Sequence, residues 1–316
     1  MPGQSEDNAP DVITHEAEGE PIAVTSELLR AWPLPRSDGD SSQGRGKDTR
    51  GSVLVVGGST EVPGALVLAG VGALRAGAGK LQIATCREVA PSIAIAVPEA
   101  RVLGLSQTEG GDIDPAAAAR LIDAVNGVPA ALIGPGMLDI PTVQELLRRL
   151  LPEVEDTALA LDAGALSAVS DNRAALHHLE GAVVLTPHPL ELSLMLGIEQ
   201  GEVEGDPLGM ARRAAREARA VVALKGAKTY IAAPDGATYR YAEGNIGLAT
   251  SGSGDTLAGV VAGLLARGAD AAQAAVWGVY LHGEAGNTMT RRMGTLGFLA
   301  RELLAEIPAL MARFDD

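Results

Sequence analysis

From Gly51 onward, short apolar runs rich in β-branched residues alternate with longer alanine-rich runs of helical spacing. Apolar runs without polar alternation indicate strands covered on both faces, and regular strand-helix alternation predicts a mostly parallel sheet. The predicted strands are Val53–Val56, Leu81–Ala84, Val102–Leu105, Ala131–Ile133, Ala158–Leu161, Val183–Leu185 and Val221–Leu224. The predicted helices between them are Ala65–Ala76, Pro115–Val125, Thr142–Leu150, Ala174–Leu179, Glu191–Leu196 and Leu208–Ala218. This pattern predicts a three-layer α/β/α sandwich.

The alternation stops near residue 228. Lys228–Ala233 and Ala237–Ala242 flank the turn Pro234-Asp235-Gly236, which predicts an antiparallel hairpin at the edge of the parallel sheet. Three helices are predicted after it, at Thr256–Arg267, Ala271–Asn287 and near Leu299–Met311. Because no linker or internal repeat divides residues 51–316, we expect them to form a single domain.

The first 50 residues have a different character. Residues 1–20 are rich in acidic residues, Pro, Gly and Asn, which predicts disorder because such residues bury too little surface to offset ordering entropy. Thr25 to Trp32 could form one short helix, with Thr25 or Ser26 as its cap. The stretch Ser37–Arg50 again reads as a loop. We therefore expect residues 1–50 to be an acidic, largely disordered extension with one short helix.

The formal net charge of −15 argues against nucleic-acid and membrane partners. This charge repels nucleic acid and anionic membranes, and no stripe of Lys and Arg offsets it. The single cysteine, Cys86, excludes an intrachain disulfide and cannot build a zinc site by itself, which favours a reducing compartment. The chain shows no basic-then-apolar leader and no apolar run of membrane-spanning length. We therefore expect a cytoplasmic protein.

The segment Gly244–Gly259, reading GNIGLATSGSGDTLAG, is the most informative in the chain. Its small residues lead into Asp255 at the start of a long apolar helix, where unpaired N–H groups and the helix dipole attract anions. An acid at this point also caps a helix in the ordinary way. Capping alone, however, does not require Gly252, Ser253 and Gly254 in succession, so this interpretation favours a phosphate site.

Other unusual loops follow the predicted strands. Ligands of parallel sheets bind beyond the carboxyl ends of the strands, so these loops are expected to converge with the start of the Asp255 helix. They are Gly57–Gly64, Gly134-Pro135-Gly136, Asp162-Ala163-Gly164, Thr186-Pro187-His188-Pro189 and Lys225-Gly226-Ala227-Lys228-Thr229. The Gly57 turn lacks the spacing of a dinucleotide fingerprint, and Gly79-Lys80 lacks the partners of a phosphate-binding P-loop.

Four polar residues in these loops each admit two interpretations. His188, held between two prolines, could point at a substrate or bond nearby backbone. Lys225 and Lys228 could neutralise phosphate or be solvated loop charges. Glu191 is a weak candidate for holding Mg²⁺ through water, but an acid in the first turn of a helix also complements its dipole. The metal ligands remain unknown from sequence.

Five segments together resemble the ADP- or ATP-dependent NAD(P)H-hydrate dehydratases, a branch of the ribokinase-like superfamily. They are GSVLVVGGSTEVPGA, LDAGAL, VVLTPHPLE, VALKGAKTYIAAPDG and GNIGLATSGSGDTLAG, and the resemblance runs from about Gly51 to the last residue. It implies a ribokinase-like fold and a repair enzyme, a hydro-lyase that dehydrates the S epimer of hydrated NADH or NADPH. Bacterial members use ADP, eukaryotic members use ATP, and Mg²⁺ is the expected metal.

The resemblance also implies roles for individual residues. Ala65, Gly136 and His188 would contact the hydrated dinucleotide, and Asp255 would face it. The adenine nucleotide would be held by Lys225, Gly226, Ala227, Lys228, Thr229 and Gly254. Asp255, ionised at neutral pH because a free carboxyl has a pKa of about 3.9, would accept the proton of the ring hydroxyl as that oxygen is phosphorylated. The amides of Gly252, Ser253 and Gly254 would stabilise the transferring phosphoryl group.

The chain departs from the family pattern at four positions, all expected to touch the cleft. Val62 replaces an aromatic residue, Gly164 the second acid of LDAD, Leu190 the glycine of PHPGE, and Ser251 the first glycine of TGGSGD. These changes leave open a small-alcohol kinase, such as one for a vitamin precursor, or a nucleotide sensor without catalysis.

The resemblance implies partners as well. Relatives often carry an epimerase domain before this one, and residues 1–50 are too short and polar to be that domain, so we expect a separate epimerase. Related bacterial enzymes are oligomeric, and the Gly- and Ala-rich helix faces permit close subunit packing. A homo-oligomer, specifically a tetramer, is therefore expected.

Overall fold

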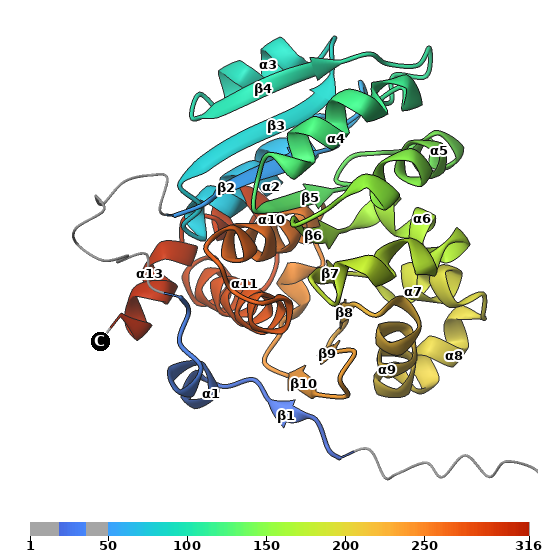
Figure 1. Ribbon diagram of the computed structural model, residues 1–316. Helices are drawn as coiled ribbons and strands as arrows, with labels where there is room; N and C mark the ends of the chain where they lie inside the picture. Colours follow the sequence, from blue (N-terminus) through green and yellow to red (C-terminus); the bar gives the residue numbers. More distant parts are fainter. Residues whose placement is uncertain (1–18, 36–49, 316) are drawn as a thin grey trace, which may run out of the picture.

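The computed structural model describes residues 19–35 and 50–315, and a ten-stranded sheet lies at its centre (Figure 1). The strand order is β1-β10-β9-β8-β7-β6-β5-β2-β3-β4. The strands are β1 (Ile22–Ala23), β2 (Ser52–Val56), β3 (Lys80–Cys86), β4 (Ala100–Leu105), β5 (Ala130–Ile133), β6 (Ala158–Leu161), β7 (Val183–Leu185), β8 (Val221–Leu224), β9 (Thr229–Ala232) and β10 (Thr238–Tyr241). Disorder was predicted for residues 1–20 and a loop for Ser37–Arg50, and most of both segments, 1–18 and 37–49, lies outside the described residues.

The strands from β2 to β8 pair in parallel, as the sequence pattern predicts. The predicted hairpin is confirmed as well, since β9 runs antiparallel to both β8 and β10. One strand was not expected. β1, from the N-terminal segment, pairs in parallel with β10 and forms the outer edge of the sheet.

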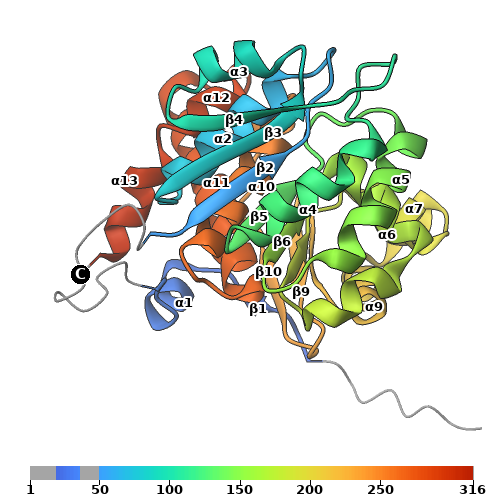
Figure 2. The same cartoon turned by 45° about the horizontal axis from the view of Figure 1, so that its top comes forward.

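Helices cover both faces of the sheet, which confirms the three-layer architecture (Figures 1 and 2). One face packs against α2 (Gly64–Arg75), α10 (Ser253–Ala266) and α11 (Ala271–Met293). The other packs against α4 (Ala118–Asn126), α5 (Ile140–Leu150), α6 (Leu166–Asp171), α7 (Pro189–Leu196) and α9 (Pro207–Ala218). The remaining α-helices are α1 (Ser26–Ala31), α3 (Ala90–Ala96), α8 (Gln200–Gly205), α12 (Ala300–Leu303) and α13 (Ile307–Met311).

One predicted helix has a different geometry. Arg173–Leu179 forms the 3₁₀-helix η4, where the sequence pattern predicted an α-helix over Ala174–Leu179. Asn172, at ψ 73, separates η4 from α6, and Glu180 ends it in the left-handed region at φ 49. The backbone at Asn172 and Glu180 confines η4 to seven residues, and its hydrogen bonds follow the tighter 3₁₀ pattern.

Helix α10 is buried in the core, because it is apolar on all sides. It crosses α2 so closely that a Cβ at Gly259 would overlap the carbonyl oxygen of Ala69, and one at Gly263 would overlap that of Ala73. These two glycines therefore set the distance between the helices.

The N-terminal segment packs onto the domain. The predicted short helix is confirmed as α1, and the Thr25 hydroxyl caps it by accepting from the Leu28 N–H at 3.3 Å. Trp277 of α11 donates its indole N–H to the Trp32 carbonyl oxygen at 2.9 Å. The Trp32 ring stacks on Tyr239 of β10, with centroids 5.9 Å apart. This segment therefore covers the β10 edge of the sheet and holds α11.

Candidate active site

The loops after the parallel strands meet at one edge of the sheet. The Gly58 N–H donates to the Pro135 carbonyl oxygen at 2.7 Å, which ties the loop after β2 to the loop after β5. The Lys225 N–H donates to the Pro187 carbonyl oxygen at 2.8 Å, which ties the loop after β8 to the loop after β7. Since the carboxyl ends of parallel strands lie at the same edge, the expected convergence of these segments follows from the strand order.

An ion pair lies at the centre of this edge. Lys225 Nζ donates to Asp162 Oδ1 at 2.9 Å, and the same oxygen accepts from the Thr186 hydroxyl at 2.8 Å. Asp162 is buried, with 2% of its surface exposed. Burial alone would lower the pKa of Lys225, but the surrounding carboxylates, Asp162 first, outweigh burial and raise the pKa. Lys225 therefore remains a cation that can face a phosphate.

Asp255 stands beside this pair, in the first turn of α10. Burial raises the pKa of its carboxyl to about 6, the negative charge of Asp162 adds to the rise, and Lys225 opposes it. A carboxyl with a pKa near the working pH can both take and return a proton, which suits a general base. Asp255 is thus partly buried, close to a fixed cation, and poised to exchange a proton.

The start of α10 leaves main-chain donors open. Gly252 is the N-cap residue at φ +84, and no side chain caps the helix. The Ser253 N–H was predicted to face the phosphoryl group, but it donates to the Thr250 carbonyl oxygen at 3.2 Å and closes the turn before α10. The N–H groups of Gly254 and Asp255 have no acceptor within the described part of the chain. A methyl group at Gly254 would lie 3.4 Å from Lys225 Nζ. Two open amides and an ammonium therefore lie together, as an anion site requires.

His188 and Glu191 form a capping box at the start of α7. The His188 N–H donates to Glu191 Oε2 at 2.7 Å, and His188 Nδ1 accepts from the Glu191 N–H at 3.2 Å. Glu191 Oε2 also lies 3.8 Å from Lys225 Nζ. Both residues thus have a local structural role, and the exposed imidazole still faces solvent on the Lys225 side of the site, so its contact with substrate stays a prediction.

Ala65 and Gly136 lie next to each other at the other end of the edge. Gly136 has φ +72, and a methyl group there would lie 3.1 Å from Ala65 Cβ and 2.5 Å from the Val62 carbonyl oxygen. The first-strand loop and the Gly136 loop therefore pack backbone to backbone. The structure brings these two residues together. The loop that carries Asp162 lies between them and Lys225.

Beyond Lys225, the rest of the predicted nucleotide loop lies nearer to solvent. Gly226, Ala227 and Lys228 are exposed, and Thr229 begins β9 at the point where the chain reverses. The described structure gives these residues no side-chain contact with the Asp255 cluster. Their part in holding a nucleotide stays a prediction.

The four departures from the family pattern now have positions. A Cβ at Gly164 would lie 2.7 Å from the Met137 carbonyl oxygen, so the loop as it stands has no space for an acidic side chain there. Leu190 and Val62 are 47% and 39% exposed, and Ser251 is exposed in the turn before α10. These three side chains point away from the core, so they change the rim of the site and not its charged centre.

The described residues hold no group of three or more His, Cys, Asp or Glu that could bind a metal ion. Asp162 and Glu191 are each occupied by hydrogen bonds within the site. Mg²⁺ that accompanies a nucleotide needs only one or two carboxylates, because phosphates and water supply the other ligands. The site therefore fits a metal that arrives with a nucleotide.

No helix in the described ranges could span a membrane.

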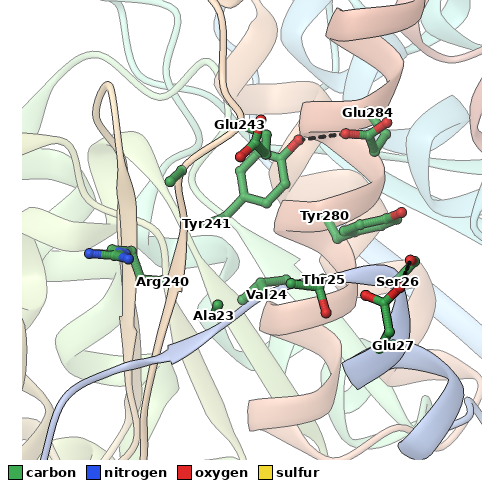
Figure 3. Close-up of a pocket in the computed structure, with 11 residues that line it drawn as sticks. Ala23, Val24, Thr25, Ser26, Glu27, Arg240, Tyr241, Glu243, Tyr280 and Glu284 are labelled. Atoms are coloured by element: carbon green, nitrogen blue, oxygen red, sulfur yellow. Dashed lines mark hydrogen bonds between the residues drawn. The ribbon is translucent and has the colours of Figure 1, made fainter.

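A separate cavity of about 330 Å³ lies between the N-terminal segment, β10 and α11 (Figure 3). Its lining includes the Tyr241 hydroxyl, which donates to Glu284 Oε1 at 3.0 Å, and the Tyr280 ring. None of the residues proposed for the active site lines it. We therefore place the chemistry at the Asp255 edge, where the cation and open amides are, and not in this cavity.

Comparison with known proteins agrees with this geometry. A sequence model described as NAD(P)H-hydrate dehydratase matches residues 53–309. The chain belongs to the NAD(P)H-hydrate dehydratase family. An ADP-dependent (S)-NAD(P)H-hydrate dehydratase from Xanthomonas campestris is 48% identical over 92% of this chain and 96% of its own length.

Solved structures of similar proteins share the fold. An ADP/ATP-dependent NAD(P)H-hydrate dehydratase from Bacillus subtilis, co-crystallised with ATP and Mg²⁺, is 34% identical, with a TM-score of 0.78 over 95% of this chain and all of that chain. A ribokinase-like superfamily protein from Enterococcus faecalis is 25% identical, with the same TM-score over 93% of this chain and 96% of its own. The predicted ribokinase-like fold is confirmed.

Three polar residues of this family member's site escaped sequence reasoning. The sequence pattern marks Asp162 only as part of a loop, although an acid at the end of a buried strand is a signal that singles it out. The pattern likewise marks Thr186 only within its loop, where its hydroxyl donates to Asp162. His282 of α11, which contacts Ser253, lies within a long helical pattern and carried no signal.

Proposed function

We propose that this chain dehydrates the S epimer of hydrated NADH or NADPH and restores the intact cofactor, with ADP as phosphoryl donor. Membership of the family and the name of the Xanthomonas relative support this proposal. The observation that carries it is the position of the Asp255 carboxyl beside the Lys225 ammonium at a helix start with open amides. A base, a cation and anion-binding amides in one place are the parts that phosphoryl transfer to a hydroxyl requires.

The proposed reaction has two steps. Asp255 accepts the proton of the ring hydroxyl while that oxygen attacks the terminal phosphorus of ADP and AMP leaves. Phosphate then leaves the ring, pushed by the lone pair of the ring nitrogen, and a proton lost from the neighbouring carbon restores the double bond. Hydroxide is a poor leaving group and phosphate a good one, so phosphorylation makes the elimination fast.

The charged centre has a defined part in this scheme. Lys225 is held by Asp162 so that its ammonium faces the migrating phosphoryl group, and the amides of Gly254 and Asp255 donate to the same oxygens. Mg²⁺ bound to the nucleotide supplies further neutralisation of charge. Gly252 and Ser253 shape the turn, while Gly226, Ala227, Lys228 and Thr229 contact the nucleotide, and Ala65, Gly136 and His188 contact the hydrated dinucleotide.

We also propose that the chain forms a homo-oligomer, specifically a tetramer, in the cytoplasm. A separate epimerase would convert the R epimer to the substrate. Sedimentation of the purified chain checks the tetramer.

The direct test is the recovery of nicotinamide absorbance from hydrated NADH with ADP and ATP in parallel reactions. We expect recovery with ADP, and a loss of about 10²–10⁴ in turnover in Asp255→Asn, because a general base typically contributes that factor. Asp156→Asn, an exposed acid outside the site, is the control and should keep full activity. A phosphorylated product that persists would indicate a small-alcohol kinase instead. The absence of any nucleotide-dependent reaction would indicate a nucleotide sensor without catalysis.

A further inference from the structure

Helix α10 has an unusual start for a helix so deep in the core. Its N-cap residue is Gly252, and no side chain bonds the first amides. A Ser, Thr or Asp cap ordinarily stabilises a helix by occupying an N–H of the first turn. A capping side chain here would block the very amides that an anion must use, so the first turn has to be held in another way.

His282 supplies such a hold from the neighbouring helix. Its Nε2 lies 2.9 Å from the Ser253 hydroxyl, and Ser253 is the first residue of α10, with 5% of its surface exposed. This bond uses a side-chain oxygen, so it fixes the turn without consuming the Gly254 or Asp255 N–H. Because α11 packs along α10, the imidazole is anchored by the core of the domain.

The charge state of His282 suits this position. Burial lowers the pKa of His282 to about 4, a hydrogen bond with the Ser253 backbone opposes that shift, and the positive charge of Lys225 adds to it. The imidazole is therefore neutral at physiological pH and does not repel the Lys225 ammonium or compete with it for phosphate. A neutral imidazole offers one donor and one acceptor, and either can serve the Ser253 hydroxyl.

We propose that His282 is a positioning residue that holds the first turn of α10 through the Ser253 hydroxyl and so aims the Gly254 and Asp255 amides at the ligand. The identity of that ligand as a nucleotide phosphate rests on the proposed function. The hold on the turn rests on the contact between His282 and Ser253 alone.

Two variants separate this bond from the volume of the side chain. His282→Phe keeps a ring but loses the hydrogen bond, and His282→Gln places an amide near the position of Nε2. We expect His282→Phe to lower kcat by about ten- to hundredfold, because small misplacements of aligned groups cost that much. The KM for ADP should change by less than about threefold, since Lys225 still binds the nucleotide. His282→Gln should recover most of the lost kcat.

Ser253→Ala removes the same bond from the other side. If the two residues act as one unit, the double variant Ser253→Ala/His282→Phe should be no slower than the slower single variant. His177→Phe is the matched control, because His177 is also partly buried, its Nε2 lies 3.0 Å from the Glu217 carbonyl oxygen, and it lies in η4, which contributes no residue to the proposed site. It should keep wild-type kinetics. Additive losses, or no rescue by Gln, would overturn the proposal.

Hydrogen exchange gives a readout that needs no substrate. His282→Phe should speed amide exchange in residues 250–258, while His177→Phe and His282→Gln leave that segment as in the wild type. Unchanged exchange in His282→Phe would refute the role of His282 whatever the enzyme turns over. Wild-type protein that binds ADP without dehydrating the hydrate would refute the proposed function alone, and the exchange result would still decide the role of His282.

Discussion

At the scale of residues, Asp255 makes the activity depend on pH. Its pKa is raised to about 6, by burial first, and only the ionised form can accept a proton. We expect kcat/KM to rise tenfold per pH unit below about pH 6 and to level off above it. A profile of kcat/KM for the hydrated cofactor, measured with saturating ADP, checks this in the ADP complex, and a midpoint near pH 4 would contradict the assignment of Asp255 as base.

Asp162 should change the midpoint of the pH profile that Asp255 sets. Its negative charge raises the pKa of Asp255, and it also partly neutralises Lys225, which lowers that pKa. Asp162→Asn removes the first effect and strengthens the second, so the acid limb of the profile should move to lower pH. Measured profiles of this variant and of the exposed control Asp156→Asn should differ in midpoint, and an alkaline shift in Asp162→Asn would be incompatible with this electrostatic arrangement.

The same carboxyl should reduce stability. Its folded pKa lies above the ordinary value of 3.8, so the folded state prefers the protonated form, and stability is lost as pH rises through the folded pKa. Asp255→Asn should therefore gain stability over wild type between about pH 4 and pH 6, reaching on the order of 1–3 kcal/mol at pH 7.5. Urea unfolding at pH 4 and pH 7.5 measures this difference, and an equal difference at both pH values would disprove the electrostatic cause.

Sequence reasoning located some of these residues and not others, for a physical reason. Glycine and serine before an apolar helix mark a helix start that admits an anion, so Asp255 and Gly254 could be found from local order along the chain. The pairing of Lys225 with Asp162 joins two strand ends 63 residues apart, and His282 meets Ser253 across 29 residues. Such contacts depend on strand order and helix packing, which no local pattern encodes.

At the scale of elements, the contact between α2 and α10 is the most constrained. Gly259→Ala would place a methyl group against the Ala69 carbonyl oxygen, and overpacking of this kind costs about 1–3 kcal/mol. Gly201→Ala in the exposed α8 meets nothing within 4 Å and should keep stability or raise it slightly, because alanine favours a helix more than glycine does. Urea midpoints of the two variants test this, and equal midpoints would show that α2 can move away from α10 without cost.

The strands and long helices were predictable because each buries a continuous apolar run. Predicted Leu81–Ala84 and Val102–Leu105 fall within β3 and β4, which extend by two residues or so at their ends. The short helices α3, α6 and α8 were missed, because six or seven residues hold too few turns to establish a period. For the same reason η4 was wrongly predicted as α-helical.

At the scale of the whole molecule, the N-terminal segment closes the open edge of the sheet. The Val24 N–H donates to the Arg240 carbonyl oxygen at 2.9 Å, next to the β1 pairing. Val24→Pro removes this donor and should lower Tm by several degrees, at a cost of about 1–3 kcal/mol. Ser26→Pro puts the same residue at the first position of α1, where proline is favoured, and should be tolerated.

Calorimetry of both proline variants would decide between a packed segment and a dispensable one. Equal melting temperatures would show that β1 adds nothing to the domain. The sequence could not indicate β1, because two residues carry no alternation and the pairing reaches across to Tyr239 and Arg240.

The uncapped beginning of α10 couples ligand binding to the stability of the folded protein. A phosphate seated on the Gly254 and Asp255 amides would do for this helix what a serine or aspartate does for others, and α10 runs through the middle of the apolar interior. The free energy of unfolding should then rise as ADP occupies the site, by RT ln(1 + [ADP]/Kd) for a ligand that binds only the folded chain. The melting temperature should rise with it. A cell rich in adenine nucleotide would keep this enzyme more robust than one depleted of it.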